Sequence, residues 1–131
     1  MITEYNDDMT KAASDGSMDP FCLAAKYCHK FVNIHPFADG NGRTCRIILT
    51  AMLLKYAGIV VPIGENDDDR SEYLGVASSS SLSEQSWKEA DKDERAFMLP
   101  PWSELAYLTL KCAKKSLVEW ADKLELDEDT E

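Results

Sequence analysis

The chain has 131 residues, of which 44% are hydrophobic and 29% charged, and this is the size and composition of one globular domain over residues 1–131. A formal net charge of −10 argues against a broad surface for DNA or RNA. There is no apolar run of about 18 residues and no N-terminal signal pattern, so we expect a cytoplasmic protein without membrane partners.

Two helices are predicted before the first functional motif. Residues 1–16 are polar with spaced apolar positions, which indicates a short helix that ends near Gly16. Asp19 followed by Pro20 is typical of a helix start, with an N-cap and a proline in the first turn. A second amphipathic helix is therefore expected over residues 20–33, with its apolar face at Phe21, Ala24, Cys28, Phe31 and Val32.

A loop and a central helix should follow. Pro36 disfavours helical backbone at His35, and Gly40 and Gly42 permit positive φ, so residues 35–41 are predicted to be a loop. From about Gly42 the residues are apolar on nearly every side, which predicts a buried central helix up to a C-terminal glycine at position 58. Its apolar residues are Ile47, Ile48, Leu49, Ala51, Met52, Leu53 and Leu54.

The C-terminal half is predicted from weaker signals. We expect a brief strand or extended connector at 59–63, a short helix at 70–77, a loop at Ser78–Ser81, a helix around 84–95 and a break at Pro100-Pro101. The last helix should begin at Ser103 and bury one stripe formed by Ala106, Leu110, Ala113, Leu117, Trp120 and Leu124. Together these elements predict an all-α fold with little or no β structure.

The four cysteines form no C-x-x-C pair. Cys22, Cys28 and Cys112 stand among apolar residues, so we interpret the cysteines, with Cys45, as reduced and buried rather than as a zinc site or a disulfide framework. His29 is interpreted as a structural histidine.

The stretch with the most chemical information is His35-Pro36-Phe37-Ala38-Asp39-Gly40-Asn41-Gly42-Arg43-Thr44-Cys45-Arg46. Its glycines let the backbone curl around an anion at a helix N-terminus, where unpaired N–H groups and the helix dipole favour negative charge. Arg43 and Arg46 are three residues apart and share one helix face, from which two guanidinium groups can grip phosphate oxygens. Phe37 is interpreted as a core residue that anchors the loop.

Two further residues complete a phosphate-transfer site. Asp39 is a carboxylate beside the phosphate cradle, and Mg²⁺ prefers one or two carboxylates together with substrate phosphates and water. His35 stands at the loop entrance, and a histidine there can accept a proton near neutral pH, an effect of roughly 10²–10⁴-fold. The combination of residues is more informative than any one of them, because a turn alone needs neither the histidine nor the arginines.

This stretch resembles the signature of the Fic (filamentation induced by cAMP) family, H-P-F-x-[D/E]-G-N-[G/K]-R-x-x-R, at every specified position. A looser similarity covers most of the chain, including Arg70-Ser71-Glu72-Tyr73, but is poor over residues 78–100. The resemblance implies a helical Fic fold with the active-site loop between two central helices. It also implies a protein adenylyltransferase that moves AMP from ATP onto a Ser, Thr or Tyr hydroxyl of a target protein.

The resemblance also implies a role for each site residue. His35 would be the general base, and Asp39 would hold Mg²⁺ between the α- and β-phosphates. Arg43 would stabilise the leaving pyrophosphate, and Arg46 would bind the γ-phosphate. The other nucleotide-binding residues would be Gly40, Asn41, Gly42, Thr44 and Tyr73, and Leu74 stands where a second tyrosine is common.

Alternatives within and beyond this enzyme class stay open. Gly42 favours nucleotidyl transfer, because the Doc-like branch that transfers the γ-phosphate carries lysine there. The donor could also be UTP, GTP or CDP-choline, or the chain could be a nucleotide-binding module without transfer activity.

Two family features have no counterpart in the sequence. No hairpin is indicated before His35 for the flap that places the target, and the inhibitory motif [S/T]-x-x-x-E-[G/N] is matched only nearly, by Ser80 to Gln85. We therefore expect a portion of a longer protein, with an acidic tail at 125–131. An inhibitory helix would then come from another chain or a missing segment, unless regulation is different.

Overall fold

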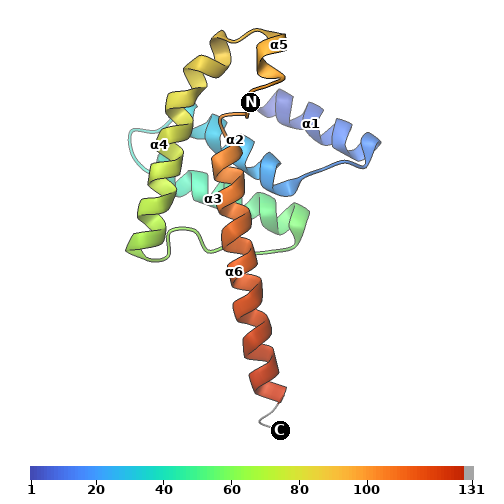
Figure 1. The fold of residues 1–131 in the computed structure, drawn as a ribbon, viewed down its shortest axis with the longest axis vertical. Coiled ribbons are helices and arrows are strands. Elements are labelled where there is room, and N and C mark those ends of the chain that lie inside the picture. The colour runs from blue at the N-terminus through green and yellow to red at the C-terminus, as the bar shows by residue number, and fades with distance from the viewer. Residues whose placement is uncertain (129–131) are drawn as a thin grey trace.

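The computed structural model describes the backbone of residues 1–128 and the side chains up to residue 125. This part of the chain folds into helices without a strand (Figure 1), which confirms the all-α expectation. The helices are α1 (Ile2–Asp15), α2 (Pro20–Ile34), α3 (Asn41–Ala57), α4 (Asp67–Glu89), α5 (Lys92–Arg95) and α6 (Ser103–Glu128). Residues 59–63 are a connector, and positions 129–131 of the expected acidic tail lie outside the described residues.

Local signals set the ends of the first three helices, as predicted. The Asp19 carboxylate accepts hydrogen bonds from the backbone N–H groups of Phe21 and Cys22 at 2.9 and 3.1 Å, which satisfies donors that the start of α2 leaves unpaired. Gly16 and Gly58 adopt left-handed backbone after α1 and α3, where a side chain would be strained.

Helices α2 and α3 form the centre of the fold, and α6 crosses them with α4 alongside (Figure 1). The core residues with the least exposure include Ala24, Ala25, Cys28, Cys45, Leu49, Leu53 and Leu105. Cys28 and Cys45 are joined by a disulfide between α2 and α3, with Cα atoms 5.2 Å apart. The expectation of reduced cysteines is therefore wrong for this pair, because close helix packing brings two cysteines 17 positions apart into bonding range. Cys22 is exposed rather than buried.

Helix α3 is buried on one face rather than all round. Leu49 and Leu53 are fully buried, whereas Ile47 is 67% and Leu54 is 54% exposed. The prediction of a helix enclosed on every side is wrong, because no helix of the described chain packs on the face that carries Ile47 and Leu54.

Helix α4 runs through the predicted serine loop. Asn66 caps it by accepting the Asp69 N–H at 2.8 Å, and the helix continues across Ser78–Ser81 to Glu89. The loop prediction is wrong: serine is a moderate helix former, and the Glu84 side chain ties this part of α4 to α2 through a 2.6 Å contact with His29. The helix expected around 84–95 is divided by a capping box at Asp91, which starts α5.

The last helix begins at Ser103 as predicted, but only its first half packs against the other helices. Leu105, Leu108 and Ala113 are buried, whereas the apolar residues from Leu117 onward are exposed, and Figure 1 shows α6 extending away from the other helices. The prediction that the whole stripe is buried is therefore wrong at Leu110, which is 49% exposed, and beyond Ala113. No described helix has the length and apolar content needed to cross a membrane.

Candidate active site

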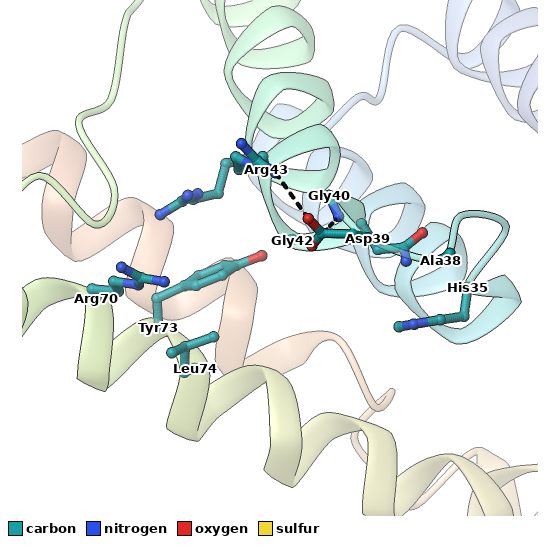
Figure 2. A pocket seen from close by; sticks show the side chains of 11 residues that line it. His35, Ala38, Asp39, Gly40, Gly42, Arg43, Arg70, Tyr73 and Leu74 are labelled. Carbon is teal, nitrogen blue, oxygen red and sulfur yellow. Dashed lines mark hydrogen bonds and ion pairs between the residues drawn. The ribbon is translucent and has the colours of Figure 1, made fainter.

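The motif loop forms one wall of an open cleft with a volume of about 520 Å³, and α4 forms the other wall (Figure 2). Small-molecule pockets typically measure about 300–1,000 Å³, so this cleft is large enough for a nucleotide. The cleft brings together His35, Asp39, Gly40, Asn41, Gly42, Arg43, Arg46 and Tyr73, eight of the nine predicted site residues. Thr44 is half-buried on α3 and does not line it.

His35 ends α2 in a strained backbone conformation. It is the sole non-glycine residue of the described chain with positive φ, at 50°, and its N–H donates to the Phe31 carbonyl at 3.1 Å. This left-handed position after a helix is usually glycine, because a side chain there costs energy. The side chain is exposed at the cleft, so the fold gains nothing visible from a histidine and the position points to function.

Asn41 holds the loop closed. Its side-chain Oδ1 accepts the Phe37 N–H at 3.1 Å, and its Nδ2 donates to the Phe37 carbonyl at 2.6 Å. Asn41 is only 5% exposed, and its two partly buried bonds fix the loop ahead of α3. The Phe37 ring is 51% exposed, so the prediction that it anchors the loop from the core is wrong, and the buried asparagine performs that task.

The head of α3 is open to an anion. Gly40 precedes the helix with φ of 87°, and the Asp39 carboxylate accepts the Gly40 N–H at 2.7 Å and pairs with Arg43 at 3.3 Å. The Asp39 and Arg43 side chains are 92% and 72% exposed, so the pair is well solvated and weak. A ligand can therefore separate these two side chains at little cost.

The residues present fit a magnesium ion only if a substrate completes the site. The described chain contains no cluster of three side chains that could hold a metal. Asp39 supplies one exposed carboxylate beside the N-terminus of α3, and a Mg²⁺ ion held by a single carboxylate takes its remaining ligands from substrate phosphates and water.

Two residues shape the side of the cleft that carries Arg46, which we call the arginine wall, and neither was predicted from the sequence. Gly64, in the connector before α4, has φ of 75°, and a Cβ there would lie 2.7 Å from Nη1 of Arg46. The absence of a side chain at Gly64 thus leaves the space that the Arg46 guanidinium occupies. Arg70 lines the cleft from α4, one helical turn before Tyr73 and Leu74. The Arg70–Tyr73 spacing was the available signal for it.

Tyr73 forms the floor of the cleft on the α4 side. It is 3% exposed, and burial raises the pKa of its phenol, with a smaller opposing effect from Arg46, so the ring stays neutral at physiological pH. Its hydroxyl lies 3.8 Å from the Cys28 sulfur.

His29 lies in the core and not in the cleft, as predicted. It is 3% exposed and contacts Glu84, which also pairs with Lys88 at 3.1 Å. Glu84, the glutamate of the near-match to the inhibitory motif, is therefore used between helices and not at Arg46.

Comparison with known proteins finds similarity to one family over the N-terminal part of the chain. A model of the Fic/DOC family matches residues 1–53. A Fido domain-containing protein of Dictyostelium discoideum is 42% identical over 78 residues, covering 59% of this chain and 52% of that protein. Protein adenylyltransferase fic-1 of Caenorhabditis briggsae is 36% identical over 75 residues, covering 56% of this chain and 13% of that protein.

A similar relationship holds for protein adenylyltransferase Fic of Culex quinquefasciatus, which is 34% identical over 94 residues, 69% of this chain and 19% of that protein. No solved structure matches the chain significantly. The chain thus spans about half the length of the Dictyostelium relative and under a fifth of these two adenylyltransferases. Residues 1–53 are thus similar to the Fic/DOC family, and the relatives that share this region are Fic or Fido proteins.

Proposed function

We propose that this chain is a protein adenylyltransferase, which moves AMP from ATP to a Ser, Thr or Tyr hydroxyl of a target protein. The observation that carries the proposal is the open cleft in which an exposed histidine and two arginines surround the N-terminus of α3. The relatives from Caenorhabditis and Culex, which are named protein adenylyltransferases, support the same chemistry.

In the proposed reaction, the target hydroxyl oxygen attacks the α-phosphorus of ATP. The His35 imidazole accepts the hydroxyl proton as the new P–O bond forms, and the bond between the α-phosphorus and the pyrophosphate oxygen breaks. AMP stays on the target, and pyrophosphate leaves with its electron pair. His35 suits this role because its side chain is exposed at the cleft.

The phosphates would lie over the start of α3. Backbone N–H groups of Asn41 and Gly42 would face them together with the positive end of the helix dipole, joined by that of Gly40 once a phosphate replaces the Asp39 carboxylate as its acceptor. Arg43 would stabilise the pyrophosphate, Arg46 would bind the γ-phosphate, and Tyr73 would lie near the adenosine. A Mg²⁺ ion held by Asp39 would neutralise phosphate charge when bound.

The test is incubation of the chain with ATP labelled on the α-phosphate, Mg²⁺ and a protein extract, followed by detection of labelled protein. We expect labelling by the wild type and loss of labelling in His35→Ala. Label that persists in His35→Ala would contradict the assigned base. Competition by unlabelled ATP, UTP, GTP and CDP-choline identifies the donor, and we expect ATP to compete best.

Calorimetry with ATP and Mg²⁺ separates transfer from binding alone. The proposal predicts that Arg46→Ala weakens ATP binding and labelling together. ATP binding that is normal in the wild type while no protein is ever labelled would instead identify a binding module.

A further inference from the structure

The cleft gathers positive charge in a chain whose formal net charge is −10. Three of the four arginines in the sequence, Arg43, Arg46 and Arg70, line it. Of the described residues that line the cleft, only Asp39 carries a carboxylate. The fourth arginine, Arg95, donates hydrogen bonds to backbone carbonyls of α4 and so has a structural role. This concentration of guanidinium groups indicates a ligand with several negative charges, because guanidinium binds phosphate oxygens through paired hydrogen bonds.

Arg70 supplies this charge from the wall opposite the motif. It lies in the second turn of α4, and Figure 2 shows its side chain beside Tyr73, across the cleft from Gly42 and Arg43. Arg70 is exposed, and it forms no ion pair within the described chain, although three aspartates precede it at the start of α4. Its charge is therefore available to a ligand in the cleft.

Arg70 and Arg46 approach each other at Gly64. A Cβ on Gly64 would lie 2.7 Å from Nη1 of Arg46 and 3.7 Å from the Cα of Arg70, so the Arg46 guanidinium lies next to the start of the Arg70 side chain. Arg46 is half-buried, and it too forms no ion pair with any residue that the structure describes. Two like charges this close, one of them partly removed from water, favour the binding of an anion between them.

We propose that Arg70 and Arg46 together bind the terminal phosphate of the donor, and that Arg70 thereby makes the site specific for a nucleoside triphosphate. This inference rests on the proposed function, in which the phosphates lie over the start of α3 and Arg46 binds the γ-phosphate. Arg70 holds the same phosphate from the α4 wall. A terminal phosphate suits this pair, because it carries about 1.5 to 2 negative charges near pH 7 and three acceptor oxygens.

A donor without a γ-phosphate leaves the arginine pair without an anion. ADP ends one phosphate earlier. In CDP-choline the diphosphate ends in choline, a cation, which two guanidinium groups repel. Of the donors that the sequence leaves open, the pair therefore favours ATP, UTP and GTP over CDP-choline, and it does not choose among the bases.

Calorimetry of the full chain with ATP, ADP or AMP, each with Mg²⁺, tests the inference. Arg70→Gln should raise the dissociation constant for ATP roughly tenfold, the loss expected for one charge-assisted contact, and should change those for ADP and AMP less than about threefold. Arg70→Lys should recover part of the ATP affinity, because lysine restores the charge without the planar fork. The matched control is Lys92→Gln, which removes an exposed positive charge on α5 and should bind all three nucleotides as the wild type does.

Two further measurements separate a binding role from a structural one. Thermal unfolding of Arg70→Gln should match that of the wild type, because the Arg70 side chain is exposed and makes no ion pair in the described part of the chain. In the labelling assay, unlabelled CDP-choline should compete with ATP roughly ten times better in Arg70→Gln than in the wild type, since the advantage of the γ-phosphate is reduced.

The inference and the proposed function can fail separately. The inference is overturned if the wild type binds ATP no more tightly than ADP, if Arg70→Gln binds ATP as the wild type does, or if it weakens ADP as much as ATP. An equal loss in Lys92→Gln would also overturn it, because net charge alone would then explain the effect. These results would leave the proposed function standing wherever protein labelling proceeds. Selective loss of ATP affinity in a chain that never labels a protein would support the inference and contradict the proposed function.

Discussion

The α2–loop–α3 region and the outer half of α6 use their side chains in opposite ways. In this region, the Asp19 cap fixes the start of α2, the Asn41 bonds fix the loop, and the Cys28–Cys45 disulfide joins α2 to α3. On α6 beyond Ala113, large apolar side chains face outward without a partner in the described chain. The first region is built to hold a fixed geometry, and the second has a surface that still requires a neighbour.

This contrast predicts where substitutions act. Changes in the α2–loop–α3 region should alter ATP binding and transfer, whereas changes on outer α6 should leave both unaltered.

His35 should separate chemistry from stability. We expect His35→Ala and His35→Gly to reduce label transfer by roughly 10²–10⁴-fold, the usual contribution of a general base. His35→Gly should also raise the free energy of unfolding by about 0.5–1 kcal/mol, because glycine adopts the left-handed backbone without strain. Transfer assays and thermal unfolding measure the two effects. Loss of stability in His35→Gly would show that the imidazole supports the fold after all.

Asn41 should contribute to both the stability of the fold and its affinity for ATP. Asn41→Ala removes two partly buried hydrogen bonds to the Phe37 backbone, so we expect a loss of about 2 kcal/mol in unfolding free energy. ATP affinity should fall as well, since the loop before α3 loosens. Denaturant unfolding and calorimetry provide the measurements.

The matched control is Asn33→Ala, near the end of α2, whose partly buried amide donates to the His29 carbonyl and also lies 3.2–3.3 Å from the His29 ring nitrogens. It should cost about 1 kcal/mol, because no loop backbone group loses its partner, and it should leave ATP affinity unchanged. Equal effects of the two substitutions would contradict the role given to Asn41.

The site region could be predicted from sequence because its signals are local. Asp19-Pro20, Pro36 and the glycines after α2 act through backbone conformation within a few residues, so the ends of α2 and α3 follow from them. Eight residues of the motif and α4 were likewise expected at one site, and the structure brings them to one cleft. Their chemical roles stay predictions.

The errors concern contacts between distant residues. Four consecutive serines are typical of a loop. The contact between Glu84 and His29, which are far apart in sequence, holds their helix against α2. Apolar residues on every side of α3 predict burial all round, but the sequence pattern does not say which helices pack against α3. The face that carries Ile47 stays exposed. Phe37 was assigned to the core by its ring, whereas the loop is fixed by the amide of Asn41. The Gly64–Arg46 contact likewise depends on two segments meeting in space.

Gly64 provides a finer test of the arginine wall. Gly64→Ala would place a Cβ 2.7 Å from the Arg46 guanidinium at a positive φ, so Arg46 must move. We expect the dissociation constant for ATP to rise about tenfold, which corresponds to one weakened charge-assisted contact. Calorimetry with ATP and Mg²⁺ measures this shift.

Gly75→Ala is the matched control, because Gly75 lies within α4 and a Cβ there meets nothing within 4 Å. It should leave ATP affinity unchanged and raise the unfolding free energy by about 0.5–1 kcal/mol, since alanine is the better helix former. If Gly64→Ala binds ATP as tightly as Gly75→Ala does, the connector does not position Arg46.

The smallest predicted effect lies in the α2–α4 contact and depends on pH. Burial raises the pKa of Glu84, but hydrogen bonds from His29 and Lys88 outweigh this and hold the pKa below its usual value of 4.5. A carboxylate with a lowered pKa stabilises the folded state above pH 4.5, and this contribution is lost as the pH falls through the folded-state value. Glu84→Gln should therefore lower the unfolding free energy by about 1 kcal/mol at pH 7, and the difference from wild type should shrink toward acid. Urea unfolding at several pH values measures it, with the exposed Glu89→Gln as a control without effect. A difference that stays constant down to pH of about 3 would mean that Glu84 acts by packing and not by charge.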